Sequence, residues 1–306
     1  MLLVGPPGSG KSMLAARLPE LLPPLSAHEA LEVASIASMA GHRLDVRRWT
    51  RRPFRAPHHT ASAHAIVGGG PLIRPGEISL AHHGVLFLDE LPEFDRRVLE
   101  SLREPLESGA ITIARASARL ELPAQFQLVA AMNPCPCGYF GDPAHACRCS
   151  AGRIERYRQR ISGPLLDRID IRIDVPRIAA AQFTSLAAAA TRRAPGPAAE
   201  DAVALAQRAR CWRLERSGCL TARLNSRQLQ RCCALPRASR QLLERSAERL
   251  ALSGRGIHRL LAVGRTIADI EGSERIEPAH LAEAVQLRRA LDGLTWPATP
   301  CSPRPA

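Results

Sequence analysis

Lysine is nearly absent from this 306-residue chain. Lysine and arginine together number 42, and Lys11 is the only lysine among them, so any lysine-dependent chemistry must use that residue. The chain also lacks an apolar run near the ~20 residues that a membrane-spanning helix needs, and no signal-peptide pattern precedes Lys11. The sequence contains no internal repeat. These absences exclude a membrane span and a repeat array, and they predict a cytoplasmic protein.

Basic charge is what the composition has in excess. The net charge is +13 and the sequence pI is about 10.4. Such an excess predicts a polyanionic partner, most simply nucleic acid. A GC-biased genome also explains a preference for arginine, although it explains less well the excess over 29 acidic residues, and both interpretations stay open. The length favours two domains, and nine cysteines in a cytosolic chain do not favour a disulfide framework.

Lys11 lies in a glycine-rich run that matches the P-loop pattern G-x-x-x-x-G-K-[ST]. The run comprises Gly5, Pro6, Pro7, Gly8, Ser9, Gly10, Lys11 and Ser12. Apolar residues 1–4 are typical of a short buried strand and residues 13–18 of a helix, so bound phosphates would meet a helix N-terminus. The pattern predicts ATP binding, with Lys11 on the phosphate oxygens and the Ser12 hydroxyl on Mg²⁺.

Two further apolar stretches end in polar side chains. Residues 85–88 precede Asp89 and Glu90, and residues 126–132 precede Asn133. In an open parallel sheet, side chains at these places reach a ligand at the carboxyl edge. We predict that Asp89 holds Mg²⁺, that Glu90 polarises the attacking water and that Asn133 contacts the γ-phosphate or that water. The alternatives are a solvated acidic turn and a turn-forming asparagine.

Arg168 lies in a third pattern, Leu-Leu-Asp-Arg-Ile-Asp, at residues 165–170. An arginine that follows the other motifs can complete the site of a neighbouring subunit by stabilising charge on the transferred phosphoryl group. One arginine among so many is more simply a surface salt bridge. Without further context the sequence favours the salt bridge.

These motifs, in this order and followed by a helical region, resemble those of AAA+ ATPases. The runs RAPHHT at 55–60, PGEISLAH at 75–82 and NPCPCG at 133–138 narrow the resemblance to magnesium-chelatase-like AAA+ ATPases of the ComM/YifB family, over about residues 1–290. The resemblance implies an α/β fold, in which a P-loop NTPase core with a parallel sheet and a pre-sensor β-hairpin insertion is followed by a C-terminal all-α lid domain. It also implies a ring-forming, hexameric ATPase that acts as a DNA branch-migration helicase in natural transformation and recombination.

The same resemblance assigns roles to arginines and leaves alternatives. It makes Arg168 the arginine finger and Arg255 the sensor-2 arginine, with Arg259 one turn on as its rival. Family members carry a Lon-like N-terminal domain, so we expect an N-terminally truncated member, and a Ser–Lys protease dyad is excluded because Lys11 belongs to the P-loop. The alternative functions are a magnesium-chelatase-like subunit and a nucleotide-binding remnant without motor activity. The cysteine cluster and the Pro-His-His run favour the ComM type over the chelatase subunit.

Composition divides the chain into four parts. We predict the ATPase core at 1–178, an Ala/Pro-rich linker at 179–200, a helical lid domain at 201–291 and a disordered tail at 292–306. Asn225 and Ser226 fit a helix N-terminus, and Pro278 fits a first helical turn. Within the lid, helical patterns cover residues 201–216, 225–233, 237–252, 255–271 and 278–290.

Residues 109–122 predict a β-hairpin, because β-prone apolar residues flank a turn at 115–118 on both sides. By the resemblance, this hairpin points into the channel of the ring. Arg115 and Arg119 would then contact the phosphates of branched or single-stranded DNA, independently of base sequence. The alternative is an exposed hairpin that its arginines keep soluble.

Four cysteines gather within residues 135–149, as two C-x-C pairs. A tetrahedral Zn²⁺ site needs two pairs brought together by a loop, and the glycines and proline between these pairs permit that turn. The C-x-C spacing is tighter than the usual C-x₂-C, so reduced thiols packed in a loop are the alternative; His145 is a substitute ligand. The predicted zinc ligands are Cys135, Cys137, Cys147 and Cys149. Histidines 58, 59, 64, 82 and 83 form no convincing ligand pair and are interpreted as loop or channel residues.

Overall fold

The computed structural model describes residues 1–70, 73–114, 119–177 and 197–289. They form two compact units. The first comprises Met1–Ile169 and Asp174–Gln207, and the second joins Asp170–Ile173 to the described residues from Arg208 onward. The predicted tail and most of the predicted linker fall outside the described residues, so the domain boundaries stay predictions.

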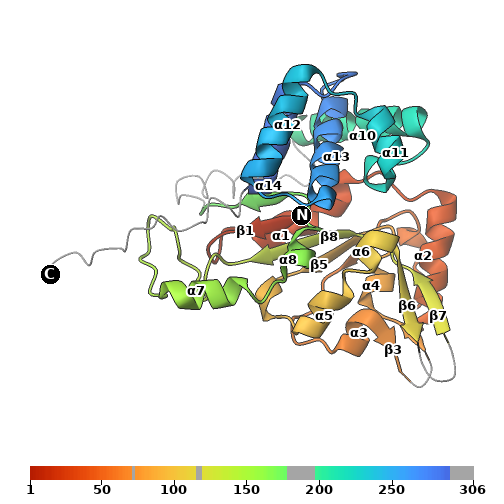
Figure 1. The fold of residues 1–306 in the computed structure, drawn as a ribbon. Coiled ribbons are helices and arrows are strands. Elements are labelled where there is room, and N and C mark those ends of the chain that lie inside the picture. Colours follow the sequence, from red (N-terminus) through yellow and green to blue (C-terminus); the bar gives the residue numbers. More distant parts are fainter. Residues whose placement is uncertain (71–72, 115–118, 178–196, 290–306) are drawn as a thin grey trace. The chain divides into compact units, whose positions relative to one another are not determined.

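A five-stranded sheet has four of its strands in the first unit (Figure 1), and its last strand along the chain crosses the boundary between the units. Its strands pair in parallel where β1 meets β8, β8 meets β5 and β5 meets β2. All four residues of β5 are buried, as expected of strands that are covered on both faces. In spatial order the strands are β2 (Phe54–Arg55), β5 (Val85–Leu88), β8 (Gln127–Met132), β1 (Leu2–Val4) and β9 (Arg172–Asp174). The predicted α/β fold with a parallel sheet is confirmed.

Helices of the first unit flank this sheet (Figure 1). Two of them have clear local causes: Ser26 and Glu29 form a reciprocal capping box at the start of α2, and Pro105 opens the short helix α6 at the position where proline is tolerated. The helices are α1 (Lys11–Leu21), α2 (Ala27–Met39), α3 (Ala63–Val67), α4 (Glu77–Leu80), α5 (Arg96–Ser101), α6 (Pro105–Ser108), α7 (Ala151–Arg158) and α8 (Gly163–Leu166), with 3₁₀ turns η1 (Val46–Arg48) and η2 (Leu91–Glu93). A short ribbon pairs β3 (Gly68–Gly69) with β4 (Arg74–Pro75).

The predicted hairpin is present. Strands β6 (Ala110–Ala114) and β7 (Arg119–Pro123) pair antiparallel, with Ile111 opposite Leu122. Both of these apolar side chains are buried, which fixes the register of the pair. Arg119 is exposed at the start of β7, whereas Arg115 lies outside the described residues.

The described residues of the second unit beyond Arg208 form helices joined by short connections, as the sequence predicted. Its helix starts follow the predicted caps: Asn225 forms a capping box at the start of α11, and Pro278 begins α14. The helices are α10 (Pro197–Ser217), which crosses the boundary between the units, α11 (Ser226–Cys232), α12 (Arg237–Arg249), α13 (Gly254–Ile270) and α14 (Pro278–Arg289), with the 3₁₀ turn η3 (Thr221–Arg223). Each predicted helical stretch from 225 onward matches one of them within a few residues.

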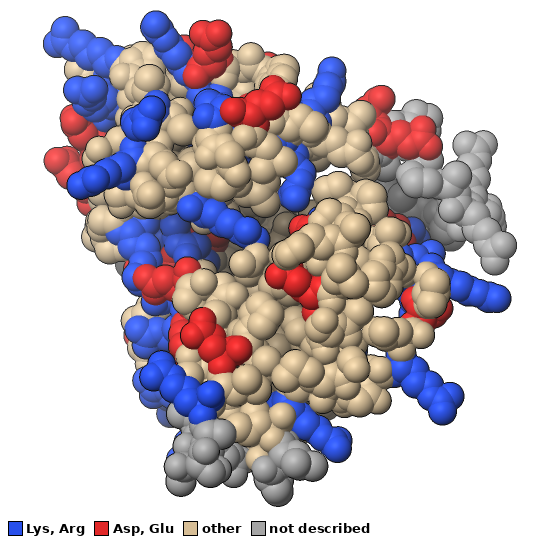
Figure 2. All heavy atoms as spheres, turned by 90° about the vertical axis from the view of Figure 1, so that its right-hand side faces the viewer, with Lys and Arg blue, Asp and Glu red and all other residues tan. Residues whose placement is uncertain are grey.

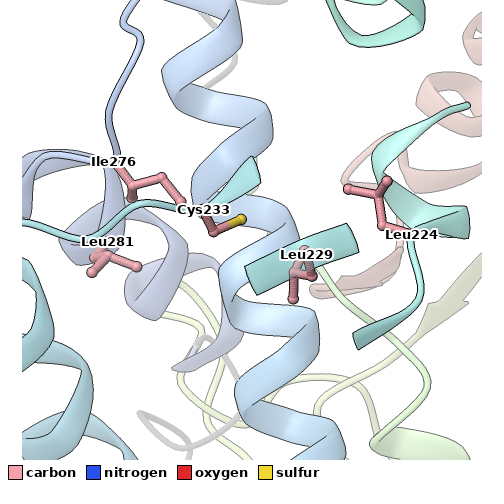
Figure 3. Close-up of a cluster of buried hydrophobic side chains, with 5 residues drawn as sticks. All are labelled: Leu224, Leu229, Cys233, Ile276 and Leu281. Atoms are coloured by element: carbon pink, nitrogen blue, oxygen red, sulfur yellow. The ribbon is translucent and has the colours of Figure 1, made fainter. Parts of the chain in front are cut away.

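One apolar cluster packs these helices together. Figure 3 shows its five buried side chains, which come from segments far apart in the sequence: Leu224, Leu229, Cys233, Ile276 and Leu281. Leu281 is fully buried, and its Cδ2 would lie 3.1 Å from a Cβ placed on Gly264. The glycine on α13 therefore lets α14 approach closely, and Leu281 fills the contact.

Leu281→Ala is expected to lower the free energy of unfolding of the second unit by about 2–5 kcal/mol, because it leaves a cavity in this cluster. Leu214→Ala is the matched control, since Leu214 is 41% exposed and leaves no cavity. Urea-induced unfolding of the intact chain measures both variants. Equal midpoints for the two would contradict the role given to Leu281.

Candidate active site

Three strands of the central sheet end side by side. The register aligns Val4 of β1 with Met132 of β8, and Leu88 of β5 with Ala130 of β8. Since the strands are parallel, the residues that follow them meet at one edge. This edge therefore gathers the loop after β1, the two acids after β5 and Asn133 after β8, as the sequence predicted for neighbouring strands.

The loop between β1 and α1 requires glycine at particular positions. Gly8 and Gly10 have φ of 75° and 86°, in the left-handed region that glycine enters without steric cost. A Cβ on Gly5 would lie 2.1 Å from the carbonyl oxygen of Val175. Gly10 is the N-cap of α1 and supplies no side-chain cap. The first N–H groups of α1 are thus left for an anion, which the helix dipole also favours.

Lys11 places its ammonium group inside this loop. Its side chain is almost fully buried, and Nζ donates to the carbonyl oxygens of Gly5 at 2.8 Å and Pro6 at 2.9 Å. Nζ also donates to Oδ1 of Asn133 at 3.3 Å, which links the ends of β1 and β8. Burial lowers the pKa of Lys11, while the nearby carboxylate of Asp89 opposes that shift. The Lys11 ammonium is therefore a buried cation, surrounded by oxygen acceptors, that a bound anion can contact.

Ser12 and Asp89 form a pair of oxygen ligands beside Lys11. The Ser12 hydroxyl donates to Oδ2 of Asp89 at 2.6 Å, and Oδ1 of Asp89 accepts from the backbone N–H of Glu90 at 2.9 Å. A hydroxyl and a carboxylate are the hard oxygen donors that Mg²⁺ prefers. The donor set fits the predicted magnesium position.

Glu90 contacts a residue that the sequence did not single out. Its carboxylate Oε2 lies 3.1 Å from Nδ1 of His59. The backbone of Glu90 has φ of 52°, a strained conformation for a residue with a side chain. The His59 ring packs edge-on against Phe94, with 6.4 Å between ring centroids. The sequence predicts only a loop or channel residue at His59. No spacing in the sequence indicates its contact with Glu90.

Arg168 is held within its own unit. Its guanidinium donates to the carbonyl oxygens of Arg103 and Pro164 and to Oε2 of Glu107 at 2.6 Å. The side chain is only 7% exposed, so this ion pair is not the surface salt bridge that the sequence alone favoured. The role of arginine finger stays a prediction.

Arg255 and Arg259 belong to the second unit. Arg255 is the second residue of α13 and is exposed, whereas NH1 of Arg259 lies 2.7 Å from Oδ1 of Asp170. The contact of Arg259 ties α13 to the segment 170–173 of its own unit. Which of the two arginines is sensor 2 stays a prediction.

The four clustered cysteines converge. Their sulfur atoms all lie within 4.8 Å of one another, with 3.4 Å between Cys135 and Cys137, 3.7 Å between Cys135 and Cys147, and 3.6 Å between Cys137 and Cys147. Four Zn–S bonds of ~2.3 Å in a tetrahedron separate the sulfur atoms by about 3.8 Å. The sulfur cluster, with Cys149 as its fourth member, therefore has the dimensions of a zinc site.

The surroundings of the cluster favour thiolate at one position. Burial opposes ionisation of Cys137, but hydrogen bonds from backbone N–H groups and neighbouring thiols lower its pKa to about 6. His145, the substitute ligand, instead stacks on Tyr139 at 4.8 Å and lies 3.6 Å from Asp142. The cysteines alone supply the converging donors.

The cysteine loop also braces the glycine-rich loop. Gly138 has φ of 85°, and a Cβ there would lie 2.6 Å from the Cδ and Cγ atoms of Pro7. On its other side, Arg158 of α7 donates to the carbonyl oxygen of Pro134 at 3.2 Å and lies over the Phe140 ring. The position of Pro7 therefore depends on the shape of the cysteine loop.

A second group of possible ligands is explained by hydrogen bonding. His83 Nε2 lies 2.6 Å from Oε2 of Glu32, and His82 Nε2 lies 3.6 Å from the same oxygen. The His82 Nδ1 accepts from the backbone N–H of Gln125 at 3.0 Å. A ring whose Nδ1 accepts carries its proton on Nε2, which leaves no lone pair there for a metal. These histidines join α2 to the turns before β5 and β8.

Comparison with known proteins follows the same division of the chain. The model of the magnesium chelatase subunit ChlI family matches residues 1–183, and that of the ChlI C-terminal region matches residues 197–288. The competence protein ComM of Haemophilus influenzae is 48% identical over 291 residues, which are 94% of this chain and 55% of the relative. The protein YifB of Salmonella typhimurium is 47% identical over 294 residues, 96% of this chain and 56% of the relative.

The chain thus spans a little over half the length of these curated relatives. A weaker similarity reaches a replication protein: the DNA replication licensing factor Mcm6 of Drosophila melanogaster is 29% identical over 105 residues, 33% of this chain and 11% of that protein. No helix among the described residues is long and apolar enough to cross a membrane.

Gly138→Ala is expected to cost about 1–3 kcal/mol of stability in the first unit, because the added methyl group strains the backbone and collides with Pro7. Gly152→Ala is the control: a Cβ there meets no atom within 4 Å, and alanine favours the helix. Thermal unfolding checks both. A melting temperature unchanged by Gly138→Ala would show that the two loops do not brace each other.

Proposed function

This chain belongs to the magnesium chelatase subunit ChlI family, and on that premise we propose that it is the ATP-binding and ATP-hydrolysing AAA+ motor of a ComM-type protein. The observation that carries the proposal is the arrangement of Lys11, Asn133, Asp89 and Ser12, which hydrogen bonds connect around the N-terminus of α1. The P-loop pattern and the family agree with that arrangement.

Each residue of this arrangement has a task in ATP binding. The uncapped N–H groups of α1 and the loop amides receive the phosphates. The Lys11 ammonium leaves the carbonyl oxygens of Gly5 and Pro6 for the β/γ oxygens. Ser12 and Asp89 would hold Mg²⁺, which neutralises phosphate charge when bound. Asn133, already in contact with Lys11, is placed to orient the γ-phosphate or the water.

Glu90 is the residue that polarises the attacking water. In the structure its carboxylate is engaged by His59. A carboxylate has two acceptor oxygens, so Glu90 can accept a hydrogen bond from water while Oε2 faces His59.

Arg168 acts on a neighbouring copy of the chain in a ring, most simply a hexamer. The family supports this assignment, and the partner that Arg168 now has, Glu107, is an anion that a phosphoryl group could replace. The exchange of one anionic partner for another keeps the buried guanidinium charge compensated.

DNA is the partner on which the motor acts. The hairpin offers Arg119 on β7, whereas the predicted contact Arg115 falls outside the described residues. Figure 2 shows basic side chains in excess over acidic ones on the face that it presents, in line with a net charge of +13. The relatives named for competence and for DNA replication support a DNA branch-migration helicase of transformation and recombination. A magnesium-chelatase-like subunit is the alternative, and the 48% identity to ComM over 94% of this chain supports the ComM type.

The cysteine cluster holds one structural Zn²⁺ ion in this proposal. The sulfur–sulfur distances and the four-cysteine donor set support it. Through Gly138 and Pro7 the ion would stabilise the loop that binds phosphate.

Steady-state ATP hydrolysis, with and without DNA, tests the function. Lys11→Ala is expected to abolish turnover, and Glu90→Gln to lower kcat by roughly 10²–10⁴-fold while ATP still binds. Arg17→Gln is the control, because Arg17 lies exposed on α1 and pairs only weakly, at 3.3 Å, with Glu20. Single-stranded and branched DNA are expected to stimulate the wild-type chain.

The outcomes separate the alternatives. Absence of hydrolysis in the wild-type chain at high ATP would make the protein a nucleotide-binding remnant. Hydrolysis that DNA does not change would contradict a DNA motor but not an ATPase.

Metal analysis of the purified chain tests the zinc proposal, with one equivalent expected. A Cys135→Ser/Cys147→Ser double variant should lose the ion and unfold at a lower temperature, since ligand removal costs the metal's contribution to folding. Cys211→Ser is the control, because Cys211 is exposed on α10. Well under one equivalent in the wild-type chain would refute the site.

A further inference from the structure

A row of arginines on α7 has no role in the site described above. Arg153 and Arg156 lie on α7, and Arg160 lies two residues beyond its last residue; all three are exposed. The spacing of three residues places Arg153 and Arg156 on one face of α7, and Arg160 lines a hollow with both. An adjacent face buries Ile154 and Tyr157, which anchor α7 to the first unit. The arginines are therefore exposed to solvent, and the helix that carries them is held in place by its buried side chains.

Two adjoining hollows lie against this row. One, of about 350 Å³, is lined by Arg153, Arg156, Arg160, Glu93, Tyr157 and Pro136. The other, of about 440 Å³, shares Glu93, Arg156 and Arg160 with it and adds Arg96 of α5. Together the linings offer four guanidinium groups and one carboxylate. Such a surface favours an anion.

We propose that the face formed by Arg96, Arg153, Arg156 and Arg160 binds the phosphate backbone of a nucleic-acid strand. The proposal rests on the DNA partner of the proposed function and adds a second contact surface to it. Figure 1 places α7 and the hairpin β6–β7 at opposite ends of the first unit, so the two surfaces are separate.

The dimensions of the row suit an extended polyanion. From Arg153 to Arg156 the helix rises by about 4.5 Å at 1.5 Å per residue, and Arg160 extends the row beyond the end of α7. A nucleic-acid strand carries one phosphate per ~3.4 Å of helix axis, so Arg153 and Arg156 are spaced to reach neighbouring phosphates. Each guanidinium can bind phosphate oxygens through two parallel N–H groups. A strand thus meets several arginines at once.

The lining also indicates backbone contact rather than base contact. Its aromatic side chains, Tyr157 and Phe94, are buried, at 7% and 4% exposure, and cannot act as stacking platforms. Contacts made by guanidinium groups to phosphates carry no base sequence information directly. The surface is therefore expected to bind DNA of any sequence.

The hollow adjoins the catalytic end of β5. NH1 of Arg160 lies 2.6 Å from Oε2 of Glu93 and donates to the carbonyl oxygen of Pro92. Both residues belong to η2, which begins directly after Glu90. A phosphate that binds Arg160 competes with Glu93 for this guanidinium. A bound strand would therefore change the contacts of η2, which begins directly after Glu90.

Fluorescence anisotropy of a labelled 30-nucleotide oligo-dT over a salt series tests the surface in the full chain. Arg153→Gln/Arg156→Gln is expected to weaken binding roughly tenfold and to reduce the slope of log K against log salt by about 1.4, at ~0.7 per lost phosphate contact. Arg47→Gln/Arg48→Gln is the control, because these exposed arginines on η1 remove the same charge elsewhere on the unit. The control is expected to bind within twofold of the wild-type chain.

A charge-preserving variant distinguishes loss of charge from a folding defect. Arg153→Lys/Arg156→Lys is expected to retain most of the salt slope. If the wild-type chain binds oligo-dT and the two Gln variants lose affinity equally, or neither loses any, the α7 surface is wrong. The proposal that DNA is the partner then still stands. A wild-type chain that binds no oligo-dT overturns both. If poly-glutamate of equal charge binds more tightly than oligo-dT and depends on the same arginines, the surface recognises an acidic protein and the proposal is wrong.

Discussion

The buried ammonium of Lys11 is the interaction on which the candidate site depends. A buried cation must have acceptors close to it, and these come from the carbonyl oxygens of Gly5 and Pro6 and from the side chain of Asn133. The loop after β1 and the end of β8 are thereby drawn together. The carboxylate of Asp89 completes the surroundings from β5. One charge thus joins the ends of three strands that the parallel sheet had already aligned.

The cysteine loop extends this dependence. It begins directly after Asn133 in the sequence and returns through Gly138 to the glycine-rich loop at Pro7. The end of β8 thus has two contacts with the glycine-rich loop. Asn133 accepts from Lys11, and the cysteine loop that follows packs against Pro7 through Gly138. A metal ion held by the four sulfur atoms would stiffen both contacts, although it lies outside the phosphate-binding loop itself.

Local patterns predicted the elements, and long-range packing supplied what they missed. The P-loop glycines, the buried β5 strand, the hairpin and the lid helices follow from spacing, capping and turn residues within about ten positions. The contact between His59 and Glu90 joins residues that no periodicity connects. The burial of Arg168 beside Glu107 likewise depends on where α8 packs. The sequence alone predicts a surface arginine there, whereas its side chain is almost fully buried.

The scarcity of lysine has a consequence for how the glycine-rich loop can be observed. A protease that cuts only after lysine has one target bond in this chain, between Lys11 and Ser12 in the first turn of α1. That bond is presented only when the turn opens, because Lys11 is almost fully buried. The rate of a single cleavage therefore measures local opening of this loop, separately from unfolding of the rest of the molecule.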